Sequence, residues 1–213
     1  VQYKDIQSSG LIKYDFIGLD TLTQMKEICG LVKMKIGKDL DVEKIPINDN
    51  KTMDLFQRGH TDDIFLFSSN DMKKYLQEFK PTSFEDLVIL NCLYRPGSMD
   101  DIAAVIKQKN STKPIEYIIP CMKSVLHNTY GIIVYQEQIM MLSRLIADFN
   151  KSESALLRMA IGMFKKEMLP ALKNQFIRGG TKNGYKKTAL EKLWNEIESK
   201  GKYAFNKSHS VCY

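Results

Sequence analysis

The sequence lacks the features that mark membrane and secreted proteins. No stretch approaches the roughly 20 consecutive apolar residues that a membrane-spanning helix needs, and the chain does not start with a signal-peptide pattern. Cysteine is scarce, and the absence of a C-x-x-C pair argues against a zinc site and favours free thiols. We therefore expect a cytoplasmic protein with no membrane partner. The four cysteines are Cys29, Cys92, Cys121 and Cys212.

The signatures of common hydrolases and nucleotide-driven motors are also missing. The sequence holds no P-loop, no H-E-x-x-H helix and no G-x-S-x-G turn. Its three histidines, His60, His127 and His209, are too far apart in sequence for their spacing to suggest a metal site. Hydrolase and nucleotide-hydrolysing motor functions therefore lack support.

What is present is typical of a globular protein with an uneven charge. Of the 213 residues, 44% are apolar and 26% are charged. Residues 150–213 hold 13 Lys and Arg against 5 Asp and Glu, whereas residues 1–149 hold 18 against 20. This asymmetry favours a polyanionic partner for the C-terminal third. A solvated, lysine-rich helical surface would give the same composition, so both interpretations stay open.

A single carboxylate interrupts the apolar run Leu11–Leu19. The pattern predicts a β-strand in which Lys13 and Asp15 share one face, while the intervening apolar residues share the other. Burying a carboxylate without a partner is costly, so Asp15 needs Lys13, another cation or a metal ion beside it. A structural ion pair and a catalytic acid both fit this pattern.

The rest of the sequence predicts helices, with one further short strand at Ile64–Phe67. Apolar spacing indicates a helix over Thr21–Lys38, and Ser69 and Ser83 are placed to cap two others. The second half is almost wholly helical, and we expect Gly179-Gly180 to punctuate it. The predicted fold is mainly α within the α+β class: a small β portion followed by a large helical domain. The sequence starts at Val1 and ends at Tyr213 without obvious end signals, so we expect a piece of a longer protein.

Three stretches carry groups suited to phosphate or nucleic acid. In Tyr135–Gln138, the Gln and Glu side chains could position a nucleic-acid backbone or brace a loop, or simply start a helix packed on the core. Arg158, followed by Lys165 and Lys166, suits triphosphate binding, and a solvated basic corner is the alternative. Asn206–His209 places amide, ammonium, hydroxyl and imidazole groups at an expected helix start, where they could hold phosphate oxygens or merely cap the helix.

Seven strings occur together, in series, over nearly the whole chain. Two are highly specific, namely Y-G-I-I-V-Y-Q-E-Q at 130–138 and F-N-K-S-H at 205–209. With these strings the chain resembles an internal piece of the bacterial replicative DNA polymerase III alpha subunit, a C-family polymerase. The weaker strings are K-Y-D-F-I-G-L at 13–19, F-E-D-L at 84–87, Y-R-P-G at 94–97, L-L-R at 156–158 and G-T-K-N-G at 180–184.

The resemblance implies that residues 1–19 close a palm domain with a nucleotidyltransferase-like core, and that residues 20–213 form the fingers domain. Asp15 and Lys13 would be catalytic: Asp15 as one of three aspartates that hold two Mg²⁺ ions, Lys13 beside the incoming nucleotide. The other two aspartates would lie upstream, outside this sequence, so the chain alone is expected neither to hold the ions nor to polymerise. The resemblance also assigns Arg158, Asn206, Lys207, Ser208 and His209 to the nucleotide, and Gln136, Gln138, Lys165, Lys166 and Lys182 to DNA.

The implied partners are primer–template DNA, a deoxynucleoside triphosphate and, for the longer protein, a sliding clamp and other replisome subunits.

Some strings depart from the family pattern. R-R-A-M-G-K-K reads R-M-A-I-G-M-F from Arg158 onward. Losing phosphate-facing cations weakens nucleotide binding, since each charge-assisted hydrogen bond contributes roughly 1.5–3 kcal/mol. A divergent paralogue that binds DNA or a replication partner without polymerising therefore remains the alternative.

Overall fold

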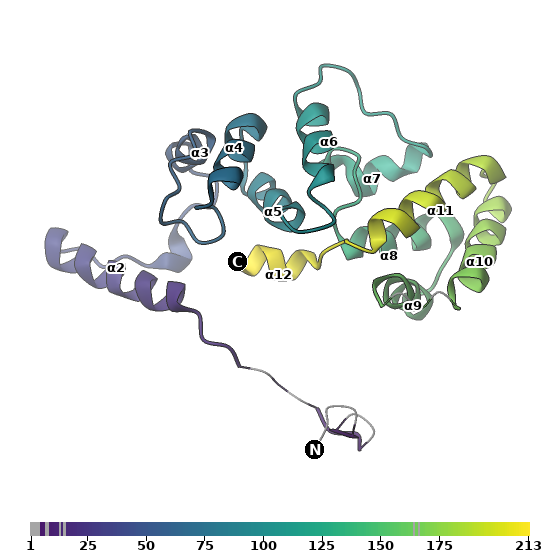
Figure 1. Ribbon diagram of the computed structural model, residues 1–213, viewed down its shortest axis with the longest axis horizontal. Coiled ribbons are helices and arrows are strands. Elements are labelled where there is room, and N and C mark those ends of the chain that lie inside the picture. The colour runs from purple at the N-terminus through teal and green to yellow at the C-terminus, as the bar shows by residue number, and fades with distance from the viewer. Residues whose placement is uncertain (1–4, 7–8, 13, 15, 164, 166) are drawn as a thin grey trace. The chain divides into compact units, whose positions relative to one another are not determined.

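The chain divides into two units, Val1–Pro46 and Ile47–Tyr213. The computed structural model describes every residue except 1–4, 7–8, 13, 15, 164 and 166 (Figure 1). Lys13, Asp15 and Lys166 therefore lie outside the described residues. In the part that is described, no helix combines the length and the apolar character needed to cross a bilayer.

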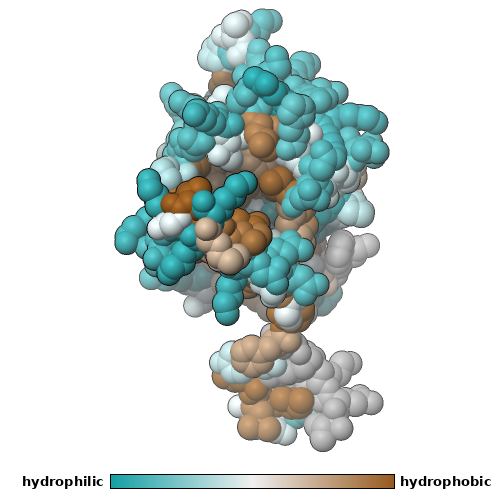
Figure 2. All heavy atoms as spheres, turned by 90° about the vertical axis from the view of Figure 1, so that its left-hand side faces the viewer, coloured by the Kyte–Doolittle hydropathy of each residue, from teal (hydrophilic) through white to brown (hydrophobic). Residues whose placement is uncertain are grey.

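The first unit contains one long helix, α2 (Asp20–Ile36), followed by the short 3-10 turn η1 (Val42–Lys44). Gly37 ends α2 in the left-handed conformation, and its N–H donates to the Lys33 carbonyl. This confirms the predicted helix, but none of its residues is buried. Figure 2 shows apolar side chains on the molecular surface, and Phe16 is 95% exposed.

The strand predicted for Leu11–Leu19 is not formed by the described residues of that run. The physical reason is pairing: an extended segment becomes a strand only when a neighbour accepts its backbone hydrogen bonds. The described residues of the first unit contain no strand with which this segment could pair. The mainly α class is thus confirmed, and the β portion is absent from the described part.

The second unit starts with four helices around one hydrophobic cluster: α3 (Asn50–Gln57), α4 (Asn70–Phe79), α5 (Phe84–Leu93) and α6 (Asp100–Lys109). The α4 helix illustrates how the sequence builds them. The Ser69 hydroxyl accepts the Met72 N–H at 3.3 Å and caps the helix, as predicted. Met72, Leu76 and Phe79 follow at helical spacing and are buried.

Ile64–Phe67 forms turns instead of the predicted strand. The Thr61 hydroxyl donates to the Phe67 carbonyl at 2.6 Å, and the Phe67 N–H donates to the Ile64 carbonyl at 2.9 Å. These local bonds close the loop on itself, so its backbone groups are not offered to a neighbouring strand.

A second cluster is built by α8 (Gln136–Ala147), α9 (Lys151–Gly162), α10 (Leu169–Lys182) and α11 (Lys187–Gly201). Gly179-Gly180 lies inside α10 and does not punctuate the chain as predicted. A Cβ on Gly179 would lie 2.2 Å from the Ala147 carbonyl oxygen, and one on Gly180 would lie 2.4 Å from Leu190. The glycines therefore allow α10 to approach its neighbours closely.

Short elements and one backbone pairing connect the two clusters. The 3-10 turns η2 (Pro120–Met122) and η3 (His127–Thr129) flank α7 (Lys123–Leu126). Tyr135 and Phe205 form an isolated parallel β-bridge immediately before α8 and α12 (Lys207–Cys212). Figure 1 shows α12 returning from α11 to lie beside α5.

Candidate functional site

The bridge between Tyr135 and Phe205 brings two distant segments of the sequence together. The Phe205 N–H donates to the Val134 carbonyl at 2.9 Å, and the Gln136 N–H donates to the Phe205 carbonyl at 2.8 Å. Because α8 and α12 both start directly after this bridge, the side chains at the two helix starts face a common junction. We call the bridge and the first residues of these two helices the junction.

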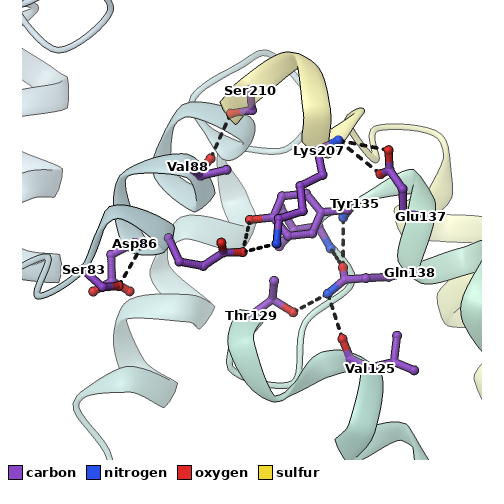
Figure 3. A network of polar contacts seen from close by, with 12 residues as sticks. Ser83, Asp86, Val88, Val125, Thr129, Tyr135, Glu137, Gln138, Lys207 and Ser210 are labelled. Atoms are coloured by element: carbon purple, nitrogen blue, oxygen red, sulfur yellow. Dashed lines mark hydrogen bonds and ion pairs between the residues drawn. The ribbon is translucent and has the colours of Figure 1, made fainter. Parts of the chain in front are cut away.

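Gln138 braces the junction from within. Its Oε1 accepts the N–H groups of Val134 and Tyr135, both at 2.9 Å. Its Nε2 donates to the Thr129 hydroxyl at 2.8 Å and to the Val125 carbonyl at 3.3 Å (Figure 3). The side chain is 4% exposed. This arrangement gives Gln138 a structural role and offers no support for its expected contact with DNA.

Glu137 holds the start of α12. Its carboxylate accepts the Asn206 side-chain amide at 2.9 Å and the Lys207 backbone N–H at 3.1 and 3.3 Å. Asn206 in turn caps the helix, because its Oδ1 accepts the His209 N–H at 2.8 Å. The expected helix cap is thus present, and an acidic side chain from α8 reinforces it.

Glu85 of α5 holds the Lys207 side chain. Glu85 Oε1 lies 2.7 Å from Lys207 Nζ and accepts the Tyr135 hydroxyl at 3.1 Å. Lys207 Nζ also lies 5.1 Å from the centre of the Tyr135 ring. Burial raises the pKa of Tyr135, and the nearby Glu85 carboxylate raises it further. The phenol therefore stays protonated and remains a donor.

Arg158 and the rest of the 206–209 segment also lie at the junction. Arg158 is exposed and donates to Gln136 Oε1 at 3.3 Å. Ser208 and His209 are exposed on α12. The structure thus brings together five of the residues expected to contact nucleotide, namely Arg158, Asn206, Lys207, Ser208 and His209, and adds Gln136 beside them.

The remaining residues expected to contact DNA are spread out. The Lys165 N–H donates to the Ala160 carbonyl at 2.9 Å, which places Lys165 near the end of α9 that carries Arg158. Lys182 is exposed in the last turn of α10, and Asn183 next to it donates to the Ile146 carbonyl at 3.1 Å. Ile146 is near the far end of α8 from the junction, about 15 Å along a helix that rises 1.5 Å per residue. Lys182 is therefore remote from the nucleotide candidates.

A buried ion pair fixes the α5 end of the site. Lys109 Nζ lies 2.6 Å from Asp86 Oδ2, with side chains 11% and 3% exposed. Burial would raise the pKa of Asp86, but bonds from Lys109, the Thr82 N–H and the Tyr130 hydroxyl outweigh it and hold the pKa below its usual value. Ser83 caps the same helix, since its hydroxyl accepts the Asp86 N–H at 3.3 Å. The pair anchors α5, which carries Glu85.

Among the residues that hold the junction together, the sequence singled out Glu137 and Gln138 but not Glu85 or Arg95. Besides Glu85 and Glu137, Arg95 stacks 4.0 Å from the centre of the Phe205 ring and donates to the Tyr203 carbonyl at 2.9 Å. All three lie within the recognised strings at 84–87, 94–97 and 130–138. Membership in these strings was the one indication in the sequence that Glu85 and Arg95 matter. Their partners lie too far away in the sequence to be deduced from it.

No metal site is formed by the described residues. No three His, Cys, Asp or Glu side chains among them come together to ligate an ion. A pocket of about 380 Å³ lies beside α12, and Arg95, Phe205 and His209 contribute to its lining. The site is thus a set of hydrogen-bond donors around a helix junction, with two carboxylates behind them.

Comparisons with known proteins identify the family of the chain. The family model for the bacterial DNA polymerase III alpha subunit finger domain matches residues 21–184. The chain is 41% identical to DNA polymerase III subunit alpha of Aquifex aeolicus over 210 residues, covering 98% of this chain and 18% of that protein. The corresponding subunit of Halalkalibacterium halodurans is 41% identical over 208 residues, with 98% and 19% covered.

The same subunit of Staphylococcus aureus strain COL is 36% identical over 204 residues, covering 96% of this chain and 19% of that protein. The chain belongs to the family of bacterial DNA polymerase III alpha subunit finger domains. It spans about a fifth of the length of the curated relatives that it matches.

Proposed function

We propose that this chain is the fingers segment of a cytoplasmic DNA polymerase that adds deoxynucleotides from deoxynucleoside triphosphates to a primer 3′-hydroxyl. Residues 1–19 would close the palm, and residues 20–213 would form the fingers. The observation that carries the proposal is the gathering of Arg158, Gln136 and Asn206–His209 at one junction. Guanidinium, amide and imidazole N–H groups are donors that phosphate oxygens accept. The net positive charge of residues 150–213 favours a polyanion.

In this proposal, Arg158 stabilises negative charge on the triphosphate while the pyrophosphate leaves. Asp15 supplies one carboxylate for two Mg²⁺ ions, and Lys13 lies beside the nucleotide. The family resemblance puts the other two aspartates upstream, outside this sequence. We expect the chain alone to be inactive in primer extension. Primer–template DNA, a sliding clamp and other replisome subunits would be partners of the longer protein.

The test uses primer extension by the full-length polymerase that contains this chain. Arg158→Met should lower kcat/KM for the deoxynucleotide by roughly tenfold to a hundredfold, because one charge-assisted contact is lost. Arg144→Met is the matched control, since Arg144 is also exposed but lies in the last turn of α8. Asp15→Asn should abolish extension. Full activity of Asp15→Asn, or equal effects of the two arginine variants, would contradict the proposal.

A further inference from the structure

The Lys207 ammonium is already occupied in this structure. Its Nζ lies 2.7 Å from Glu85 Oε1, and the same oxygen accepts the Tyr135 hydroxyl at 3.1 Å. Figure 3 shows the Lys207 side chain against Tyr135, which is 2% exposed. A phosphate group that uses Lys207 would therefore have to compete with Glu85 for the same ammonium.

A second carboxylate lies behind the same segment. Glu137 accepts the Lys207 backbone N–H and the Asn206 amide, so it bonds to the residues at which α12 starts. Glu85 differs from Glu137 in its partners, because it bonds to the side chains of Lys207 and Tyr135 and to no backbone group of α12. Releasing Lys207 from Glu85 therefore leaves the cap of α12 intact, whereas removing Glu137 would disturb the cap itself.

Other contacts also keep α12 docked when Lys207 moves. The Ser210 hydroxyl donates to the Val88 carbonyl at 3.2 Å, and the Asn91 amide donates to the Ser210 hydroxyl at 3.0 Å. Lys207 and Glu85 are 38% and 30% exposed in their side chains, so water can reach the pair. A half-exposed pair of this kind is weak enough for a multiply charged anion to displace.

We propose that Glu85 is a positioning residue that holds Lys207 against Tyr135 in a resting arrangement, and that phosphate binding transfers Lys207 from Glu85 to the phosphate. This inference rests on the proposed function of the junction as a nucleotide site. Glu85 thus sets the affinity for the triphosphate, because each bound phosphate must overcome the existing ion pair and the nearby negative charge.

The test compares the chain with its Glu85→Gln variant, using inorganic tripolyphosphate as the probe. Glutamine keeps the shape of the side chain and can still accept the Tyr135 hydroxyl, but it carries no charge. Calorimetry at neutral pH and low salt should show binding tighter by roughly threefold to tenfold, the effect expected for removing one half-exposed ion pair and one like charge. Glu191→Gln is the matched control, because Glu191 forms an exposed pair with Lys187 at 3.8 Å; it should leave affinity unchanged.

A second measurement needs no ligand. Amine-reactive labelling followed by mass spectrometry should modify Lys207 more slowly than the exposed Lys187, and Glu85→Gln should speed the labelling of Lys207 alone.

Adding Lys207→Met to Glu85→Gln should remove the gain in tripolyphosphate affinity. If the original chain binds tripolyphosphate and Glu85→Gln binds it equally or more weakly, the proposed role of Glu85 is wrong. The proposed nucleotide site is not contradicted by that result. Absence of binding by every variant would overturn both.

Discussion

Replacing Lys109 by methionine tests how the buried ion pair supports the site. Lys109 Nζ lies 2.6 Å from Asp86 and donates to the Lys80 carbonyl at 2.9 Å. It also lies 4.2 Å from the centre of the Phe79 ring. Methionine keeps most of the packing of the side-chain stem but removes the charge. Asp86 would then be a carboxylate, 3% exposed, without its cation.

The expected cost is about 3–5 kcal/mol in the free energy of unfolding at pH 7, the range for removing one member of a buried pair. The pH dependence has a definite sign. The pKa of Asp86 lies below its usual value, so its contribution to stability is present above the unfolded-state pKa of about 3.9 and is lost as the pH falls through the folded-state value. Without Lys109, burial raises that pKa, so mild acid should protonate Asp86 in the variant. The difference in free energy of unfolding between the original chain and Lys109→Met should therefore become smaller as the pH falls.

Urea denaturation from pH 7 to pH 4.5 measures both effects. Trp194, the single tryptophan, is buried in the other hydrophobic cluster. Coincident fluorescence and far-UV circular dichroism transitions would therefore show that both clusters unfold together. The control is Lys74→Met, because Lys74 pairs with Asp71 at 3.1 Å with both side chains largely exposed; it should change stability by less than about 0.5 kcal/mol. The reasoning would be refuted if Lys109→Met lowered the free energy of unfolding by less than about 1 kcal/mol. It would also be refuted if the difference in this free energy between the variant and the original chain grew in acid.

Three further outcomes follow from the described contacts. Gln138→Leu leaves two buried backbone N–H groups without an acceptor and should cost about 2–5 kcal/mol in urea denaturation; an unchanged midpoint would argue against the bracing role. Lys182→Ala should weaken duplex DNA binding by the chain and reduce the logarithmic salt slope by about 0.9, measured by anisotropy; an unchanged slope would remove Lys182 from the DNA surface. Burial raises the pKa of the Cys92 thiol to about 11, so a thiol reagent at pH 8 should label the exposed Cys212 first and Cys92 only on unfolding; equal rates would contradict the burial.

Local signals in the sequence predicted the helices well. Ser69 and Ser83 cap the helices that they were expected to cap, because a hydroxyl can satisfy an N–H of the first turn without help from the rest of the chain. The same holds for Asn206 at α12. Helical spacing of apolar residues also identified α2, although the described structure buries none of them.

The features that the sequence could not predict depend on distant partners. Gly179 suits a turn in isolation, and only the approach of Ala147 shows that it is needed inside a helix. Glu85 and Lys207 lie far apart in the sequence, so their pairing appears only once α12 packs on α5. The expected strand around Asp15 likewise depends on a neighbour that the described residues do not provide.

The string at 130–138 joins the two clusters, and nearly every residue in it makes a contact of its own. Tyr130 is left-handed with φ of 56° and donates to Asp86 at 2.7 Å, while Gly131 adopts φ of 83°, where a Cβ would lie 2.7 Å from Ile115. Val134 and Tyr135 pack into the first cluster, whereas Ile133 packs into the second.

The following polar residues then hold the junction in three directions. Gln136 meets Arg158, Glu137 holds the start of α12, and Gln138 satisfies the backbone of the string itself. These three side chains bond to other groups of the protein, so they support the framework of the junction. In the proposed function, Arg158 and α12 supply the groups that meet a phosphate, and the string determines where those groups lie. A substitution in the string should therefore act on nucleotide affinity through the placement of Lys207, even where it touches no ligand.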